Sequence, residues 1–151
     1  MRWRYKTSIE YVISVLGADV LREIRMADEC IWRADSVAQP HFRFRHQIAL
    51  CAAAAMSNAA ALAAEMLSLG GVPPARRPGL RPRTHDAASI EECLAKAQSL
   101  LAHYEKRLAM AERLGLLRLR EVFRDIVKSK RVHVLHAAVI AAAGARPRQL
   151  S

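Results

Sequence analysis

Aromatic side chains are scarce in this chain: they make up 5% of the residues, although 52% of the residues are apolar. Much of the apolar content is alanine, which favours helices and lets them approach one another closely. No stretch alternates between apolar and polar residues over the length of a strand. The 151 residues are enough to bury one core without covalent staples. These features argue against a β-sheet protein and predict a single all-α domain over residues 1–151.

Cysteine is also scarce, and the sequence lacks a C-x-x-C motif. Cys30, Cys51 and Cys93 are odd in number and far apart, so we expect reduced thiols in a cytoplasmic protein. The basic N-terminus is followed by a segment interrupted by charges, which argues against a secretory signal. The apolar stretch 48–64 is short for a membrane span and is followed by Glu65. We interpret it as a buried helix and expect no membrane association.

The sequence has neither a glycine-rich phosphate loop nor a G-x-S-x-G nucleophile motif. His41 and His46 are five residues apart, which is not the spacing of a helical metal pair. His133 and His136 can share a helix face, but no cysteine or carboxylate lies beside them at ligand spacing. We interpret these histidines as core or surface residues.

Apolar periodicity predicts four helices, over about residues 8–36, 41–69, 89–114 and 116–143. Thr7 and Ser8 offer an N-cap for the first helix, and Gly70-Gly71 marks the end of the second. Gly115 predicts the turn between the third and fourth helices. A long connection rich in proline and arginine, residues 70–88, separates the two helix pairs.

Two helical hairpins joined by one long crossover form the plan of ferritin-like bundles. Residues 69–74 (Leu-Gly-Gly-Val-Pro-Pro) resemble the end of the second helix of bacterioferritins and rubrerythrin-like proteins. Residues 15–20 resemble the first-helix segment that carries an iron-binding glutamate, and residues 97–104 resemble the third-helix segment that ends in a tyrosine. The resemblance implies a ferritin-like four-helix bundle with its crossover between helices two and three.

The same resemblance places the six di-iron ligand positions on residues of this chain. They fall on Asp19 (or Glu23, one turn further on), Ala55, Asn58, Ala97, Lys130 and His133. A di-iron centre of this type needs about four carboxylates and two imidazoles. These positions offer one carboxylate, one imidazole and a lysine, so we expect a degenerate site with no bound metal, no catalytic residue and no ferroxidase activity.

Lys130 occupies the position of a bridging carboxylate, where an ammonium group repels metal ions. A buried lysine is costly unless it is paired, so we expect an internal ion pair with Asp19 or Glu23, joined by His133. The alternative interpretation places Lys130 on a solvated basic face together with Lys128 and Arg131.

Met56 follows the second-helix glutamate position, where bacterioferritins carry the methionine that ligates a haem between two subunits. The resemblance therefore implies haem as an alternative cofactor, with Met56 as the axial ligand. Against this, methionine on an alanine-rich helix usually fills space in a core. The neighbouring first-helix residues Arg22, Glu23 and Arg25 are also charged. We interpret Met56 as a packing residue and expect no cofactor.

Acidic residues are too few for an iron-storing cage, whose pores and interior collect cations. The net charge is +10 and the sequence pI is about 10.4. The arginines of the N-terminus and the crossover are candidate basic contacts: Arg2, Arg4, Arg76, Arg77, Arg81 and Arg83. Such residues could bind phosphates of nucleic acid, or an acidic protein such as a second ferritin-like subunit.

The sequence as a whole therefore predicts a non-catalytic ferritin-like protein with a structural, regulatory or partner-binding role. We expect a homo-oligomer, at least a dimer, that assembles through helices one and two. The first alternative is a bacterioferritin-type haem-binding or iron-storage protein. The second is a basic ferritin relative that binds nucleic acid.

Overall fold

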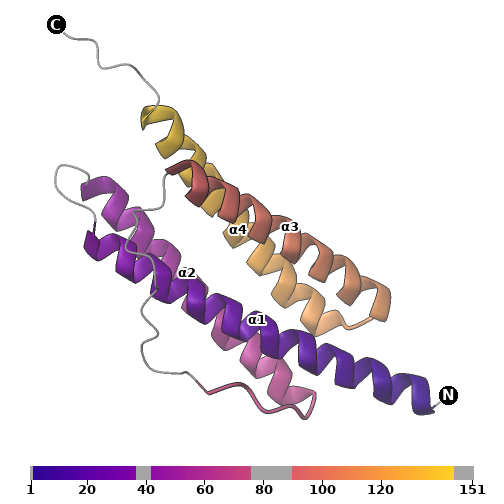
Figure 1. Cartoon of the computed structure of the whole chain (residues 1–151). Helices are drawn as coiled ribbons and strands as arrows, with labels where there is room; N and C mark the ends of the chain where they lie inside the picture. Colours follow the sequence, from indigo (N-terminus) through magenta and orange to yellow (C-terminus); the bar gives the residue numbers. More distant parts are fainter. Residues whose placement is uncertain (1, 37–41, 76–89, 145–151) are drawn as a thin grey trace, which may run out of the picture. The chain divides into compact units, whose positions relative to one another are not determined.

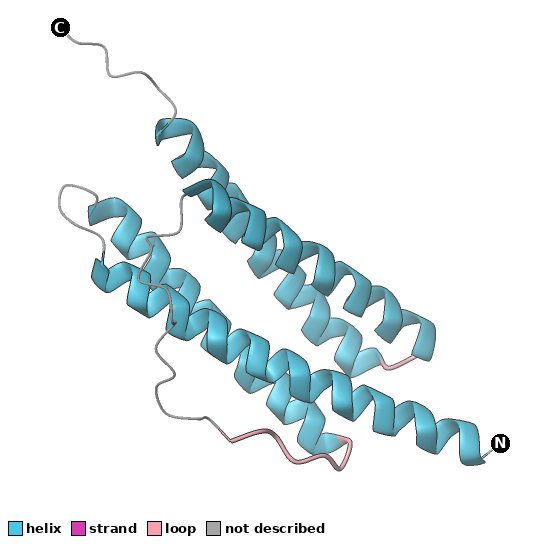
Figure 2. Ribbon diagram, in the orientation of Figure 1, coloured by secondary structure: helices cyan, strands magenta, loops and turns pink. Residues whose placement is uncertain are grey.

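The protein is helical throughout the part of the chain that the structure describes, residues 2–36, 42–75 and 90–144, apart from short turns. In these ranges the computed structural model contains α1 (Arg2–Ser36), α2 (Phe42–Ser68), α3 (Ile90–Leu114) and α4 (Leu117–Gly144) (Figure 1). Figure 2 shows helices and connecting loops without a strand in the described residues. The predicted all-α class with four helices is confirmed.

The chain divides into two compact units, residues 1–85 and 86–151. Each unit is one helical hairpin, α1 with α2 in the first and α3 with α4 in the second. Of the crossover expected over residues 70–88, residues 70–75 are described and the rest lies outside the described residues. The ferritin-like association of the two hairpins in a single domain stays a prediction.

The first hairpin is antiparallel, as three cross-helix neighbours establish. Ile13 lies beside Gly71, just past the end of α2, and Gly17 lies beside Met66. Further along α1, Glu23 contacts Asn58. As the residue number rises along α1, the number of its neighbour falls along α2.

The first hairpin buries small and aliphatic side chains at helical spacing. Those of α1 are Val12, Val15, Leu16, Val20, Ala27 and Cys30, and those of α2 are Ala52, Ala55, Ala59, Leu62 and Met66. Alanine predominates on α2, so the two helices can pack closely along their length. The start of α1 differs from the expectation: Thr7 and Ser8 lie inside the helix, which begins at Arg2, so they are not its N-cap.

The end of α2 follows the sequence signal at Gly70-Gly71. Gly70 adopts a φ of 89°, a left-handed conformation that glycine reaches without steric cost. The amide of Gly71 donates to the carbonyl of Met66 at 2.9 Å, and that of Gly70 donates to the carbonyl of Leu67 at 3.0 Å. These two bonds form a Schellman motif, which satisfies carbonyls that the helix leaves open.

The second hairpin turns at Gly115, which has a φ of 66°. The amide of Leu116 donates to the carbonyl of Ala111 at 3.1 Å, so α3 closes in the same way as α2. Its buried side chains include two large aromatics: Ala97, Tyr104, Met110, Ala111, Leu119, Phe123, Ile126, Val127 and Ala137. Gly115 thus marks the turn that the sequence predicts.

The most apolar helix is not enclosed on all sides. One helical stretch, Arg45–Ser68, is long and apolar enough to cross a membrane by length and composition, which alone is weak evidence. Only 22% of its apolar window is buried. Leu50, Met56 and Leu67 of α2 are exposed, whereas Ala55 and Leu62 are fully buried. The interpretation of residues 48–64 as a buried helix is therefore wrong for one face, which points outward.

We predict opposite effects for two glycine-to-alanine substitutions in the first hairpin. A Cβ at Gly71 would lie 2.7 Å from Ile13 Cγ2 and 2.9 Å from Met66 Cγ, so Gly71→Ala should destabilise the protein by about 1–3 kcal/mol. A Cβ at Gly17 meets Met66 Cε at 3.4 Å, an ordinary contact, so Gly17→Ala should stabilise α1 by roughly 0.5–1 kcal/mol. Urea unfolding followed by circular dichroism measures both. Equal effects of the two changes would contradict the close approach at Gly71.

Candidate functional site

The first hairpin buries the di-iron positions that the resemblance assigns to it. Asp19 and Ala55 are fully buried, and Asn58 is 8% exposed. Glu23, the alternative to Asp19, is also fully buried. Glu65 of α2 is also buried, so the hairpin encloses three carboxylates and one amide. The assigned second-helix positions, Ala55 and Asn58, contribute no carboxylate and no imidazole.

Glu23 is the carboxylate that the structure brings to Asn58. The amide Nδ2 of Asn58 donates to Glu23 Oε2 at 3.4 Å, a long hydrogen bond between buried side chains of α1 and α2. Asp19 instead forms an ion pair with Arg22, whose Nε lies 3.8 Å from Asp19 Oδ1. The side chain of Arg22 is half exposed, so this pair extends from the buried carboxylate towards the surface.

The second hairpin buries its assigned positions as well. Ala97 and Lys130 are each 3% exposed, and His133 is half-buried. Lys128 and Arg131, the neighbours of Lys130, are exposed. The interpretation of Lys130 as part of a solvated basic face is therefore wrong, because the helical period turns this one lysine inward.

The Lys130 ammonium lies over an aromatic ring within its own hairpin. Its Nζ is 5.7 Å from the ring centroid of Tyr104, within the range of a cation–π interaction. The ring of Tyr104 packs against Phe123 with the centroids 6.2 Å apart and the planes tilted by 39°. The sequence alone does not predict this contact, because Lys130 and Tyr104 lie on different helices and only the register of α3 and α4 brings them together.

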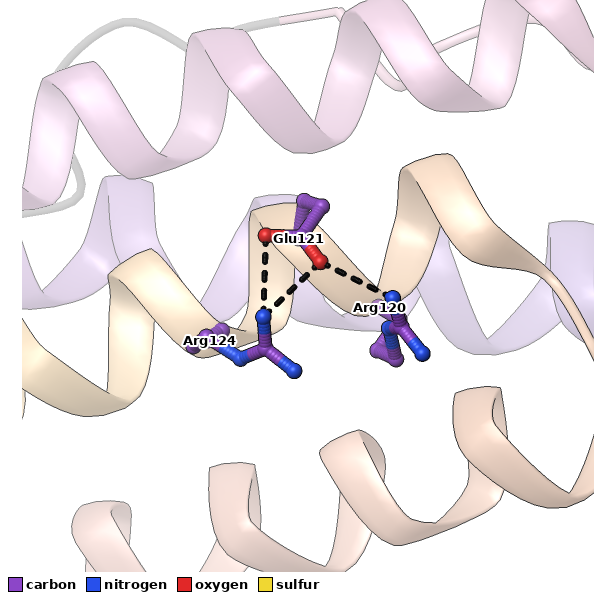
Figure 3. Close-up of polar contacts among 3 residues, drawn as sticks. All are labelled: Arg120, Glu121 and Arg124. Atoms are coloured by element: carbon purple, nitrogen blue, oxygen red, sulfur yellow. Dashed lines mark hydrogen bonds and ion pairs between the residues drawn. The ribbon is translucent and has the colours of Figure 1, made fainter.

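Other basic residues of α4 lie on its exposed face and pair locally. Glu121 accepts from Arg124 Nη1 at 2.9 and 3.1 Å and from Arg120 Nη2 at 3.2 Å (Figure 3). Arg131 forms a cross-helix pair with Glu105 at 3.7 Å. Exposed pairs of this kind contribute about 0–1 kcal/mol each, so they keep the face soluble more than they hold the hairpin together.

The residues present do not fit a di-iron centre. In the described part of the chain, no group of three or more His, Cys, Asp or Glu side chains is placed to hold a metal ion. The first hairpin offers the Glu23 carboxylate next to a neutral amide, and the second offers an ammonium where a bridging carboxylate is needed. Two iron cations require several anionic oxygen ligands, and the buried carboxylates Asp19, Glu23 and Glu65 do not form a group that could hold a metal ion in the described part of the chain.

Met56 lies on the outward face of α2. It is 37% exposed, so its interpretation as a core-filling residue is wrong. Ala53 and Ala60, one turn before and after it on the same face, are exposed as well. An accessible thioether on an apolar surface has the chemistry of an axial haem ligand, but the structure describes one copy of this surface.

The remaining site predictions lie outside what the structure tests. Arg2 and Arg4 belong to α1, and their side chains are not among those described. Arg76, Arg77, Arg81 and Arg83 lie outside the described residues, as does His41. The expected ion pair between Asp19 and Lys130 would join the two units, and it stays a prediction.

We predict that Asn58 stabilises the first hairpin through Glu23. Asn58→Leu keeps the branched shape and the number of side-chain heavy atoms but removes the donor to a buried carboxylate, and should destabilise the protein by about 1–3 kcal/mol. The additional change Glu23→Gln should restore part of this loss, because a neutral amide is less costly to bury than a carboxylate. Ser57→Ala, on the exposed face beside Asn58, is the control and should change stability by less than about 0.5 kcal/mol. Equal losses for the two single substitutions, measured by urea unfolding, would contradict a role for the hydrogen bond.

Comparison with known proteins finds no family model, no curated protein and no solved structure that matches the chain. The ferritin-like resemblance therefore rests on the residues of this chain: the segment at residues 69–74, the helix lengths and the spacing of the assigned positions. It enters the account of function as a proposal.

Proposed function

We propose that the chain is a ferritin-like protein that has lost its di-iron site and serves a non-catalytic, structural or regulatory role in an oligomer. The observation that carries the proposal is the pairing of Glu23 with Asn58 inside the first hairpin. In the ferritin-like arrangement, Asn58 stands where a ligand histidine is expected. Its neutral amide donates a hydrogen bond to the carboxylate, whereas a metal site would need that carboxylate as an open ligand.

Lys130 supports the same conclusion from the second hairpin. A buried ammonium over the ring of Tyr104 puts a fixed positive charge at a position where iron needs a negative one. Each hairpin thus provides a contact for a buried charged group from its own side chains, Asn58 for Glu23 and Tyr104 for Lys130. Such cores are stabilised by protein groups in place of metal, which suits a protein whose work is assembly or partner binding.

The outward face of α2 supports assembly into a dimer or larger oligomer. Leu67 is 60% exposed, Leu50 is 50% exposed, and the alanines between them leave the face smooth and apolar. Contiguous apolar surface of this kind marks interaction sites. A second copy of the chain offers the same face, so a two-fold contact through α2 would cover both surfaces at once.

Haem binding is the second candidate, favoured by the exposure of Met56 on that same face. Two copies related by a two-fold axis would present two thioethers to one iron, which is the arrangement known for bacterioferritins. The charge of +10 also favours acidic partners, among them a second ferritin-like subunit or nucleic acid, over the storage of cations.

We predict that protein purified from cells supplied with iron and haem contains less than about 0.1 iron per chain and shows no Soret band. Mass spectrometry of metals and an absorption spectrum give both values. About two irons per chain would overturn the proposal. About half a haem per chain, lost in Met56→Leu, would establish the second candidate instead.

We also predict that returning glutamate and histidine to the assigned ligand positions of α2 creates a site that binds metal. Ala55→Glu with Asn58→His rebuilds Glu-x-x-His beside Glu23, and should bind roughly one Co²⁺ per chain with a visible absorption band. The matched control is Ala53→Glu with Met56→His, which has the same spacing and charge on the exposed face and should bind at least tenfold more weakly. Equal binding by both variants would contradict the assigned positions. Because a buried glutamate can prevent folding, the metal content of the unchanged protein remains the deciding measurement.

We also predict that the unchanged protein sediments as a dimer or larger species at micromolar concentration. Met56→Lys with Leu67→Lys should shift it towards monomer, because two charges would have to be desolvated in the contact. The control, Leu117→Lys with Leu135→Lys, changes two exposed residues of α4 and should leave the oligomer intact. A monomeric unchanged protein would contradict the assembly, and an effect confined to the control would move the interface to α4.

A further inference from the structure

The contact between Glu23 and Asn58 fixes the register of the first hairpin and so locates two cysteines. Cys30 lies seven residues after Glu23 on α1, and Cys51 lies seven residues before Asn58 on α2. Because the helices are antiparallel, both steps move in the same direction along the hairpin. Each advances about 10.5 Å along its helix and turns the position by only about 20°.

Counting from the hydrogen-bonded pair in this way assigns Cys30 and Cys51 to the same level of the hairpin, two turns beyond that pair. The other cross-helix neighbours, Ile13 beside Gly71 and Gly17 beside Met66, show the same antiparallel direction. Because side chains seven residues apart on a helix point in nearly the same direction, Cys30 and Cys51 lie on the same sides of α1 and α2 as Glu23 and Asn58.

The surroundings suit a close approach of the two thiols. Cys30 is buried, Cys51 is partly exposed, and neither is in a disulfide. Ala27, fully buried one turn before Cys30, and Ala52, next to Cys51, keep the helices close at this level. A disulfide requires Cα atoms about 4.4–6.8 Å apart, which facing positions of closely packed helices can reach.

We propose that Cys30 and Cys51 are a redox-active pair whose disulfide links α1 to α2. The oxidant is a small-molecule disulfide such as oxidised glutathione. This inference is independent of the proposed function, because it rests on the register and the thiols alone. Cys93, in the other unit, takes no part in it.

The reaction balances in two exchange steps. The thiolate of Cys51, the more accessible residue, attacks one sulfur of the oxidant, forms a mixed disulfide and releases one small thiolate. The thiolate of Cys30 then attacks the Cys51 sulfur and releases the second small thiolate. Two protein thiols are oxidised, one small disulfide is reduced to two thiols, and the two protons pass to the released thiols.

The test is peptide mapping of the full chain after incubation with oxidised glutathione, with remaining thiols alkylated. Trypsin cleaves after Arg25, Arg33 and Arg45, so Cys30 and Cys51 fall on separate peptides. We expect a disulfide-linked pair of these peptides whose mass is two hydrogens below the sum of the two reduced peptides, and which disappears when reductant is added. The intact oxidised protein should run at the monomer mass without reductant, which shows that the link lies within one chain. Cys93→Ala is the matched control and should give the same linked pair.

Cys30→Ala should instead accumulate the glutathione adduct on Cys51, and Cys51→Ala should form no linked pair. Circular dichroism checks that each variant folds. If either fails to fold, the unchanged protein and Cys93→Ala decide the question without it. Separate glutathione adducts with no linked peptides in the unchanged protein, a link to Cys93, or a link found only between two chains would overturn the proposal.

Discussion

The structure of the first hairpin depends on one physical constraint: a carboxylate that is buried must have a hydrogen-bond or ionic partner. Glu23 is fully buried on α1, and the donor that reaches it across the hairpin is the amide of Asn58. This contact aligns the two helices, because a shift of α2 by one residue would turn Asn58 away and leave the carboxylate without that donor. Alanine side chains alone would specify the alignment poorly, since each turn of α2 resembles the next.

The second hairpin is subject to the same constraint, but its buried charge is positive, the ammonium group of Lys130. Lys130 is buried, and its ammonium lies over the ring of Tyr104, which packs in turn on Phe123. The negative face of the aromatic ring attracts the ammonium electrostatically, which offsets part of the cost of burying the charge. In ferritin-like proteins, which the chain resembles in sequence, buried carboxylates of the bundle are held together by metal. Here each hairpin shows a contact between its own side chains, and this difference is the physical basis for a metal-free interpretation.

Local signals in the sequence predicted the helices and their ends well. Gly70 and Gly115 end helices because glycine tolerates positive φ, a property of the residue itself. The N-cap at Thr7 and Ser8 was wrong, because a good cap residue can also lie within a helix that begins earlier. Contacts between side chains of two different helices could not be predicted from the sequence. The contact of Lys130 with Tyr104 can be seen only once the register of α3 and α4 is known. The proposed pairing of Cys30 with Cys51 likewise follows from the register of α1 and α2, which the sequence alone does not give.

Alanine residues lie on both the buried and the exposed face of α2, and they have a different effect on each. Ala55 and Ala59 are buried and allow the close approach on which the Glu23–Asn58 contact depends. The opposite face of α2 is equally poor in charge, with exposed alanines between Leu50, Met56 and Leu67. A helix with a single packed face usually carries charged residues on the opposite face. The outward face of α2 carries none between Leu50 and Leu67, so its sequence fits a helix that is packed on both faces, one of them by something other than α1. A second copy of the chain can cover the outward face of α2 with its own outward face, so that one contact buries both apolar surfaces. Assembly is for this reason part of the proposed function.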